Sequence, residues 1–421
     1  MERTELLTAA MADRDIYAAR RWVTLAASTV ASLCCGFFYA WSVLVKPMTE
    51  LYHWSPGNMA LAFTLIVGLP AACALLAGKL LQFMRPSTLL LIAGGILSAG
   101  TILLSFATNL GLLFAFAFVA GVGGMTYPGA TMSNLMRFFP ERRGMASGIL
   151  TGGFGLGAVI WGPVTVLLID QVGYKWTLRL LGILFFFIIA ACSRLVTVAP
   201  PGYAPRGWKS PAGHSSDPDS LPGRDWKAMI KTPNFWLLFV VIFVGLISGL
   251  MVTSHASPIV QQMLGISPEA ATAFVSYLAM GMVIGKVGWG MLSDRFGRNP
   301  VLITILALAV FGLLLLWQTG SYGPVVAGIF VVGLCYGGFL ALIGPVTLDA
   351  FGPRHFAVNF GLMFWTLAFA SYAGPRLAAT VVEANNGVYK EAFLVAAGLT
   401  VLGLILAVVN TWLGRRRVAA F

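Results

Sequence analysis

Residues 86–136 read PSTLLLIAGGILSAGTILLSFATNLGLLFAFAFVAGVGGMTYPGATMSNLM and contain no Asp, Glu, Lys or Arg. About 20 apolar residues, each adding ~1.5 Å of helix, cross the hydrocarbon core of a bilayer. The stretch is therefore long enough to predict two membrane-spanning helices folded back on each other. Residues 299–348 are equally free of charge and predict a second such pair, and residues 22–45 predict a single span.

The composition of the whole chain agrees with this interpretation. Of 421 residues, 58% are hydrophobic and 10% charged, against roughly 25% charged in a soluble domain, and the mean hydropathy is +0.85. We therefore expect an all-α polytopic membrane protein. Polar residues and helix breakers divide the chain into twelve predicted spans, near residues 22–45, 57–78, 87–107, 111–137, 144–169, 177–196, 234–258, 268–292, 300–318, 324–347, 357–382 and 392–413.

The basic residues predict the orientation of the chain. The net charge is +12, but the bases lie at helix ends and not in one soluble segment with interleaved aromatics, which argues against nucleic-acid binding. They fall on every second connection, the positive-inside pattern, so both termini should be cytoplasmic at an inner membrane. Residues 1–21 mix acids with bases and have no cleavage site, and therefore resemble a cytosolic tail more than a signal peptide. The five cysteines form no CxxC pair and favour neither a metal site nor a disulfide.

An internal repeat predicts two similar halves. Ser55-Pro56 corresponds to Ser267-Pro268 at an offset of about 212 residues, and residues 138–148 (FFPERRGMASG) correspond to residues 351–361 (FGPRHFAVNFG). We expect two six-helix bundles around a central cavity. The predicted divisions are a tail at 1–21, bundles at 22–198 and 233–414, a polar cytoplasmic linker at 199–232 and a second tail at 415–421.

Two motifs resemble known transporter families. Residues 290–298 read GMLSDRFGR, and turn glycines with an acid and flanking arginines can latch neighbouring helix ends together. This resembles the loop signature of the major facilitator superfamily, whose fold has twelve helices in two pseudo-symmetric bundles. It singles out Gly290, Asp294, Arg295, Gly297 and Arg298 as a gating motif. The first-half counterpart, residues 78–86 (GKLLQFMRP), lacks the acid, which puts a latch on that side in doubt.

The second resemblance is narrower. Residues 39–43 (YAWSV), 138–157 (FFPERRGMASGILTGGFGLG) and 232–236 (TPNFW) are similar to the oxalate/formate antiporter family and the related monocarboxylate porters. The resemblance implies transport of small carboxylates by exchange or with protons. The glycines of residues 148–157 fit either static helix packing or sliding contacts during transport. Arg142 and Arg143 fit either topology determinants or substrate contacts.

Lys286 is the principal candidate for binding an anion. It lies about five residues, or ~8 Å, from the middle of its predicted span, and no acid lies equally deep in any span. A charge at that depth costs ~2.5–3.5 kcal/mol or more on insertion scales, so it predicts a function. The resemblance implies an arginine that binds carboxylate here, and lysine offers a point charge without the bidentate fork. A lysine reaching toward the cytoplasmic surface is the alternative.

Two further ionisable residues lie within predicted spans. Arg376 fits an outer anion site, an interfacial anchor or a hydrogen bond within the bundle, and it lies about 180° around its helix from Leu367. The resemblance implies a second cation at Leu367 in carriers of dicarboxylates, so the leucine favours a monoanion. His255 fits either a hydrogen bond between helices or a titrating group coupled to protons.

The remaining candidate substrate contacts are polar side chains within the spans. Tyr127 lies near the middle of its span, matches a tyrosine of the family and could donate a hydrogen bond to a carboxylate. Asn134 shares its helix face, Tyr39 fits either the cavity or an interfacial aromatic belt, and Tyr336 lies in the span 324–347.

We therefore expect a carrier, not an enzyme, for a short monocarboxylate of the formate, lactate or pyruvate type. It would work by alternating access, without a cofactor, as a monomer among membrane lipids, with exchange or proton coupling left open. A proton-driven exporter of another substrate class is the alternative, but such exporters usually need a membrane-embedded acid. A membrane sensor or enzyme is a third, although the sequence has no phosphate-binding loop, activated nucleophile or metal cluster.

Overall fold

The computed structural model describes residues 2–200, 203–205, 223–318 and 320–418, and its regular elements in those ranges are helices. In the first half these are α1 (Glu2–Cys35), η1 (Gly36–Ala40), α2 (Trp41–Tyr52), α3 (Pro56–Val67), η2 (Leu69–Ala72), α4 (Cys73–Leu80), α5 (Pro86–Leu104), α6 (Leu110–Phe138) and α7 (Arg143–Leu195). In the second half they are α8 (Trp226–Ile230), α9 (Pro233–Leu264), α10 (Pro268–Phe296), α11 (Arg298–Gln318), α12 (Tyr322–Phe351), α13 (Phe356–Met363), α14 (Trp365–Ala384) and α15 (Lys390–Val418).

The described chain contains 11 stretches of helix long and apolar enough to cross a membrane. One of these, α7, has 53 residues and contains a non-helical residue, Gly173, with φ 76° and ψ 160°. A positive φ of this size favours glycine, which has no Cβ to clash. The two predicted spans 144–169 and 177–196 are the two parts of α7 on either side of Gly173. The predicted all-α polytopic fold is thus confirmed.

Several predicted spans differ in detail from the structure. The first consists of α1, η1 and α2, and α1 begins at Glu2, so the residues expected as a tail are helical from that point. The second is divided by the short 3-10 helix η2, which contains Pro70, and the eleventh is divided between α13 and α14. A proline has no backbone N–H to donate and interrupts the regular ladder of a helix. These breaks were not visible in hydrophobicity alone.

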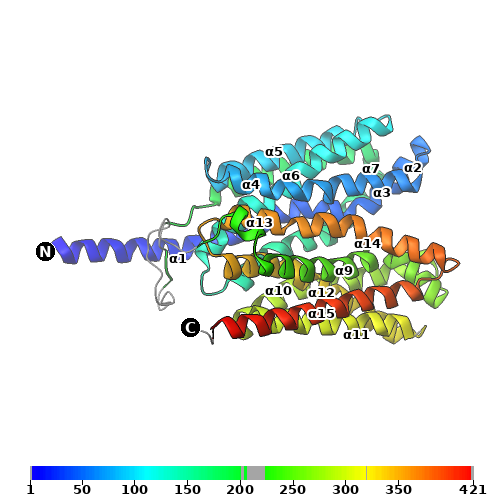
Figure 1. The fold of residues 1–421 in the computed structure, drawn as a ribbon. Coiled ribbons are helices and arrows are strands. Elements are labelled where there is room, and N and C mark those ends of the chain that lie inside the picture. Colours follow the sequence, from blue (N-terminus) through cyan, green and yellow to red (C-terminus); the bar gives the residue numbers. More distant parts are fainter. Residues whose placement is uncertain (1, 201–202, 206–222, 319, 419–421) are drawn as a thin grey trace.

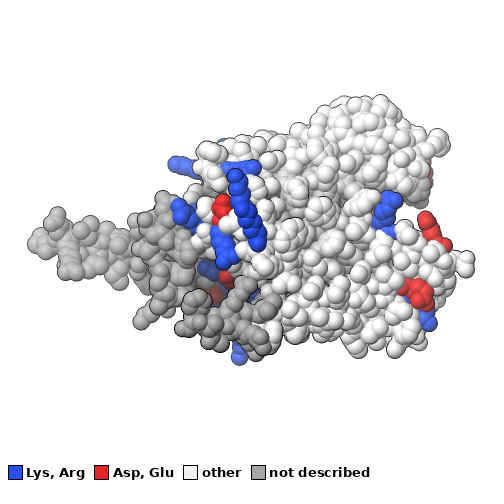
Figure 2. Space-filling view, in the orientation of Figure 1, with Lys and Arg blue, Asp and Glu red and all other residues white. Residues whose placement is uncertain are grey.

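The helices run side by side along one direction, with the two termini at the same end of the molecule (Figure 1). We call that end the terminal side and the opposite end the distal side. Figure 2 shows Lys, Arg, Asp and Glu at the two ends and a broad band without them between, on the face in view. This band is the part that the hydrocarbon core of a bilayer would surround.

The two halves of the chain pack against each other through glycines that lie in equivalent places of the repeat. A Cβ atom at Gly290 of α10 would lie 2.3 Å from the carbonyl oxygen of Gly144 in α7. A Cβ atom at Gly78 of α4 would lie 2.3 Å from the carbonyl oxygen of Ala357 in α13. Backbones this close leave no room for a side chain. We call the α7–α10 contact the seam.

Candidate functional site

Lys286 lies in α10 at the seam and is 2% exposed. Its side chain lines a cavity of ≈ 40 Å³ between the two halves. The first half contributes Val67, Met125, Pro128, Met132, Thr151 and Phe154, and the second contributes Lys286, Leu340, Phe360, Phe364 and Leu367. Among these lining residues, Lys286 is the one with an ionisable side chain. The structure therefore places the predicted anion anchor at a cavity wall and not at a membrane surface.

Glycines of α7 provide the surface on which Lys286 rests. A Cβ atom at Gly148 would lie 2.3 Å from the carbonyl oxygen of Lys286, and one at Gly155 would lie 3.1 Å from its Nζ. On the other flank, a Cβ atom at Gly337 of α12 would lie 3.0 Å from the backbone nitrogen of Lys286. The ammonium group of the second half therefore reaches the backbone of the first half because α7 presents glycines there.

The rest of the cavity wall is largely apolar. Methionine and phenylalanine side chains form about half of it, and Thr151 has the one hydroxyl group among the lining residues. The Thr151 hydroxyl donates to the carbonyl oxygen of Ser147, at 2.8 Å. Leu367 lies in this wall, at the place where the family resemblance implied a second cation in dicarboxylate carriers. The described cavity thus combines one cationic group with an apolar enclosure.

Two of the other candidates make hydrogen bonds inside the first half. The Tyr127 hydroxyl donates to the backbone carbonyl of Ser28 in α1, and Tyr127 is not among the residues that line the cavity. Asn134 donates to the carbonyl oxygen of Thr197 at 2.8 Å and accepts from the backbone nitrogen of Ala199 at 2.9 Å. Its amide fastens the segment after α7 to α6. Neither side chain is among the residues that line the cavity with Lys286.

Arg376 lies on the exposed face of α14, where its guanidinium donates to the hydroxyl of Tyr372 at 3.1 Å. Leu367 and Ser371 are buried on the other face of the same helix. Arg376 is thus not among the residues that line the central cavity, and its role as an outer anion site or an interfacial anchor stays a prediction.

His255 marks a break in α9. Its backbone has non-helical angles, φ −123° and ψ 15°, three residues before Pro258. The ring Nδ1 lies 2.8 Å from the Ser254 hydroxyl, and the ring centroid lies 5.7 Å from that of Tyr389. The histidine is therefore near the distal loop before α15 and outside the lining of the cavity.

The two remaining candidate tyrosines are Tyr336 and Tyr39. Tyr336 is 1% exposed, and a Cβ atom at Gly249 of α9 would lie 2.5 Å from its ring. It packs within the second half and is not among the cavity residues. The backbone of Tyr39 belongs to η1, but its side chain lies outside the described part of the structure.

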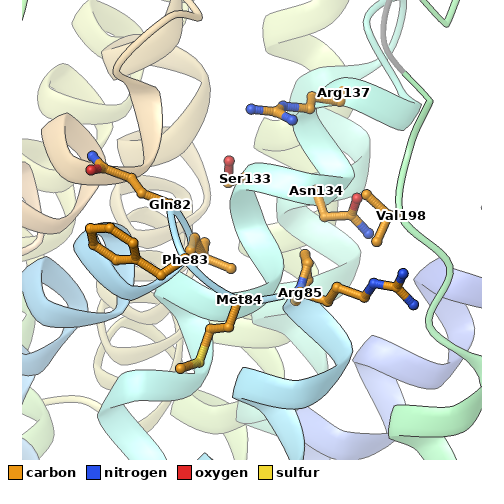
Figure 3. A pocket seen from close by; sticks show the side chains of 10 residues that line it. Gln82, Phe83, Met84, Arg85, Ser133, Asn134, Arg137 and Val198 are labelled. Carbon is orange, nitrogen blue, oxygen red and sulfur yellow. The ribbon is translucent and has the colours of Figure 1, made fainter.

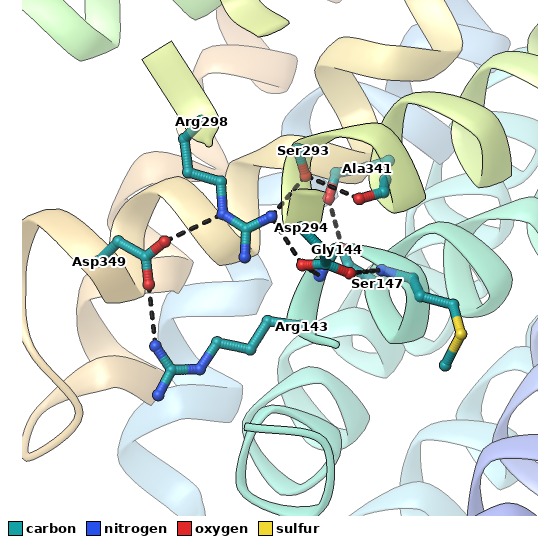
Figure 4. Close-up of polar contacts among 10 residues, drawn as sticks. Arg143, Gly144, Ser147, Ser293, Asp294, Arg298, Ala341 and Asp349 are labelled. Atoms are coloured by element: carbon teal, nitrogen blue, oxygen red, sulfur yellow. Dashed lines mark hydrogen bonds and ion pairs between the residues drawn. The ribbon is translucent and has the colours of Figure 1, made fainter. Parts of the chain in front are cut away.

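The predicted loop motif forms a latch across the terminal side of the seam (Figure 4). The carboxylate of Asp294 accepts from the backbone nitrogens of Gly144 and Met145, both at 2.8 Å, at the N-terminus of α7. An anion is favoured there because the first N–H groups of a helix have no partner within it. Arg298 donates to Asp294 at 2.8 Å within the second half. We call the contacts of Asp294 and Arg298, together with those of Asp349 and Arg143, the latch.

Asp349 of α12 completes the latch, and the sequence alone had not singled it out. Its two carboxylate oxygens accept from Arg298 and from Arg143 of the first half, both at 2.9 Å. Ser147 adds a hydrogen bond of 2.6 Å to the carbonyl oxygen of Ala341, also across the halves. Its position in the sequence could have indicated this role, because Asp349 is the acid that directly follows the charge-free residues 299–348.

The other residues of the predicted motif lie beside the latch. Gly297 has φ 87° and forms the turn between α10 and α11, a conformation that favours glycine. Arg295 is exposed and lies over the ring of Phe296, with 5.5 Å from its Cζ to the ring centroid. Arg142 is exposed at the start of α7, without a side-chain capping hydrogen bond. These two arginines thus contribute positive charge to the terminal side but are not among the residues of the latch described above.

Comparisons with known proteins agree on one family. The model of the Major Facilitator Superfamily matches residues 26–287 and 249–420. The oxalate:formate antiporter of Oxalobacter formigenes is 27% identical over 92% of this chain and 90% of its own length. Monocarboxylate transporter 12 of Homo sapiens is 25% identical over 76% of this chain and 67% of its own. The crystal structure of the human organic anion transporter MFSD10 (TETRAN) superimposes with a TM-score of 0.69, at 14% identity, covering 92% of this chain and 99% of that one.

Proposed function

Since this chain belongs to the Major Facilitator Superfamily, and is therefore a multi-pass membrane transporter and not an enzyme, we propose that its substrate is a short monocarboxylate bound by Lys286. The observation that carries this proposal is a buried ammonium group at the wall of an otherwise apolar cavity between the two halves. Charged groups inside a membrane protein typically mark the path of an ion or substrate. The names of the two relatives given above, an oxalate:formate antiporter and a monocarboxylate transporter, support the same chemical class.

The size and charge of the cavity narrow the substrate further. A cavity needs roughly 10–15 Å³ to hold one water molecule, so ≈ 40 Å³ offers room for about three groups of that size. Formate has three non-hydrogen atoms and one negative charge. A dianion such as oxalate would leave one carboxylate against apolar side chains, which is costly without a partner. Among short carboxylates, the cavity in this conformation fits formate best.

Alternating access would expose this cavity to one side of the membrane at a time. The latch holds the halves together on the terminal side, and the glycine contacts of the seam let the helices rock past each other. We place the terminal side in the cytoplasm, because basic residues concentrate there. Lys286 lies between the latch and the distal side, where a bound anion would touch both halves.

The test is counterflow in proteoliposomes that contain the purified protein. We expect labelled formate to exchange against internal formate, and Lys286→Gln to reduce that exchange by at least about a hundredfold, because the charge-assisted contacts of a buried anion are worth ~1.5–3 kcal/mol each. Lys175→Gln removes an exposed lysine of α7 and serves as the matched control. Lactate, pyruvate and oxalate form the comparison panel, and an imposed pH gradient separates proton coupling from exchange. Equal exchange by wild type and Lys286→Gln would refute the anchor.

A further inference from the structure

A second cavity lies on the terminal side of the first half, away from Lys286 (Figure 3). It has a volume of ≈ 300 Å³ and lies between the α4–α5 loop, the end of α6 and the segment after α7. We call it the loop pocket. Its lining includes Gln82, Phe83, Arg85, Ser133, Arg137 and Val198, and it shares no residue with the central cavity. Transport of a carboxylate through the central cavity gives this pocket no role.

The charged groups of the loop pocket have one sign. Arg85 and Arg137 both line it, and its lining contains no Asp or Glu. Neither guanidinium has a hydrogen bond or an ion pair to any part of the chain that the structure describes. Two such groups on one pocket raise the local positive potential and favour an anion. Arginine presents several N–H donors in a fork that matches a phosphate or carboxylate.

Two neutral features strengthen the preference for an anion. Ser133 lines the pocket, is 8% exposed, and its hydroxyl makes no hydrogen bond within the described ranges of the chain. The hydroxyl opens to the pocket, where a bound oxyanion could accept its hydrogen bond. The 19-residue helix α5 also begins at the pocket with Pro86, and its N-cap residue Arg85 makes no side-chain cap. The positive end of the helix dipole therefore points to the same place.

Apolar side chains form the other part of the pocket wall, and they favour a lipid over a soluble anion. Phe83 is 84% exposed and Val198 is 39% exposed, and Leu81 and Met84 line the pocket between them. The hydrogen bonds of Asn134 to Thr197 and Ala199 hold the Val198 wall in place. These residues lie where α4, α6 and α7 end and α5 begins, so in a bilayer we place the pocket near the level of the lipid headgroups. Basic pockets at such a level are suited to anionic headgroups.

We propose that the loop pocket binds an anionic phospholipid, with its phosphate at Arg137 and the Ser133 hydroxyl, Arg85 adding positive potential from the other side of the pocket, and its apolar part against the exposed Phe83 and Val198 (Figure 3). Gln82 occupies the position that Asp294 holds in the second half of the repeat. An acid there would bring a negative charge to the pocket. Its replacement by a neutral amide keeps the pocket purely cationic. The lipid would thus bind to the first half at the place equivalent to that of Asp294 and the latch in the second half.

The test is native mass spectrometry of the full chain in detergent, titrated with phosphatidylglycerol or with phosphatidylcholine. We expect wild type to bind phosphatidylglycerol at least about tenfold more tightly than phosphatidylcholine, since each charge-assisted hydrogen bond contributes ~1.5–3 kcal/mol. Arg85→Gln/Arg137→Gln should remove this preference. Lys79→Gln takes one positive charge from an exposed neighbour that does not line the pocket, and should retain it. Equal binding of both lipids by wild type, or an unchanged preference in the double variant, would overturn the proposal.

Two milder variants keep the test informative if the double variant does not fold. Gln82→Glu adds a negative charge at an exposed position and leaves both arginines in place, and should weaken phosphatidylglycerol binding by roughly three- to tenfold. Ser133→Ala removes only the hydroxyl and should weaken it by roughly threefold. Competition identifies the source of the anion. Inorganic phosphate or formate that displaces phosphatidylglycerol at low millimolar concentration would assign the pocket to a soluble anion and overturn the lipid assignment.

Discussion

At the residue scale, the position of the Lys286 ammonium depends on a glycine in the other half. A Cβ atom at Gly155 would lie 3.1 Å from Nζ and 3.2 Å from a methyl carbon of Val283. Either contact is too tight, so the ammonium would move by a few tenths of an ångström. One turn away, a Cβ atom at Gly152 would meet only a methyl carbon of Val287, at 3.4 Å, which is ordinary contact. The two glycines thus form a matched pair for testing the geometry of the anchor.

We expect Gly155→Ala to raise the KM for the transported carboxylate by roughly three- to tenfold with little change in the maximal rate, because a misplaced ammonium makes poorer charge-assisted hydrogen bonds. Gly152→Ala should behave as wild type within about twofold. Initial rates of counterflow at a series of formate concentrations measure both quantities. If the two alanine variants have the same KM, the ammonium is not positioned by Gly155.

The sequence predicted the location of a functional residue only where a charged residue interrupts an apolar span. Lys286 stood out because it is a charge within an apolar span, and the structure places it at the central cavity. Tyr127 and Asn134 could not be assigned in the same way, because polar residues in spans also bond to neighbouring helices. Which use applies depends on where each side chain points among helices distant in sequence. Their partners, Ser28 and the segment 197–199, follow from tertiary packing alone.

At the scale of elements, the repeat predicts helix ends well and pairings between helices poorly. Ser55 and Ser267, matched in the repeat, are both N-caps whose hydroxyls accept a backbone N–H three residues later, each followed by a proline. The asymmetry of the loop motif was also readable, because Gln82 stands where Asp294 would be expected. The residues that bind the acids of the latch could not be predicted from the sequence. The backbone N–H groups of Gly144 and Met145 reach Asp294, and Arg143 reaches Asp349, only when the two halves pack.

The latch predicts a shift between conformations. Asp294→Asn should weaken the hydrogen bonds to the start of α7 and the ion pair with Arg298, and so raise the population that is open on the terminal side by roughly tenfold. Double electron–electron resonance between spin labels at Leu80 and Phe296, one in each half and both exposed, reports the opening. We expect a larger fraction of long distances in the variant.

Glu141→Gln is the control for that measurement. Glu141 pairs with Arg21 at 2.6 Å, but both residues belong to the first half, so this ion pair does not bridge the halves. Its loss should leave the distance distribution unchanged. A distribution that responds equally to both substitutions would mean that general charge on the terminal side, and not the latch, sets the conformation.

At the scale of the whole molecule, the distribution of charge determined more than any motif. Charge-free stretches predicted the spans, and the structure contains them, with two spans merged across Gly173. The placement of the two halves relative to each other could not be predicted, since it depends on close backbone contacts such as Gly290 with Gly144. Local sequence signals such as span length and N-caps carry no information about which distant backbone lies opposite a glycine.

The same charge distribution leads to a prediction of orientation in the membrane. On the distal side, the connections carry bases and acids together, among them Lys175, Lys390, Asp170 and Glu391. The terminal side carries an excess of arginine and lysine. Because basic loops are retained in the cytoplasm, the terminal side should be cytoplasmic. Asn386, exposed in the distal loop before α15, and Arg354, exposed on the terminal side, are suitable positions to test this.

We expect Asn386→Cys to react with a membrane-impermeant maleimide in intact cells, and Arg354→Cys to react only after the membrane is permeabilised. The natural cysteines provide a low background, since Cys34, Cys35, Cys192 and Cys335 are buried and Cys73 is half-buried. The unsubstituted chain, treated in parallel, measures that background directly. The opposite labelling pattern would invert the molecule in the membrane. The latch would then close the outer side, and the loop pocket would face the lipids of the outer leaflet.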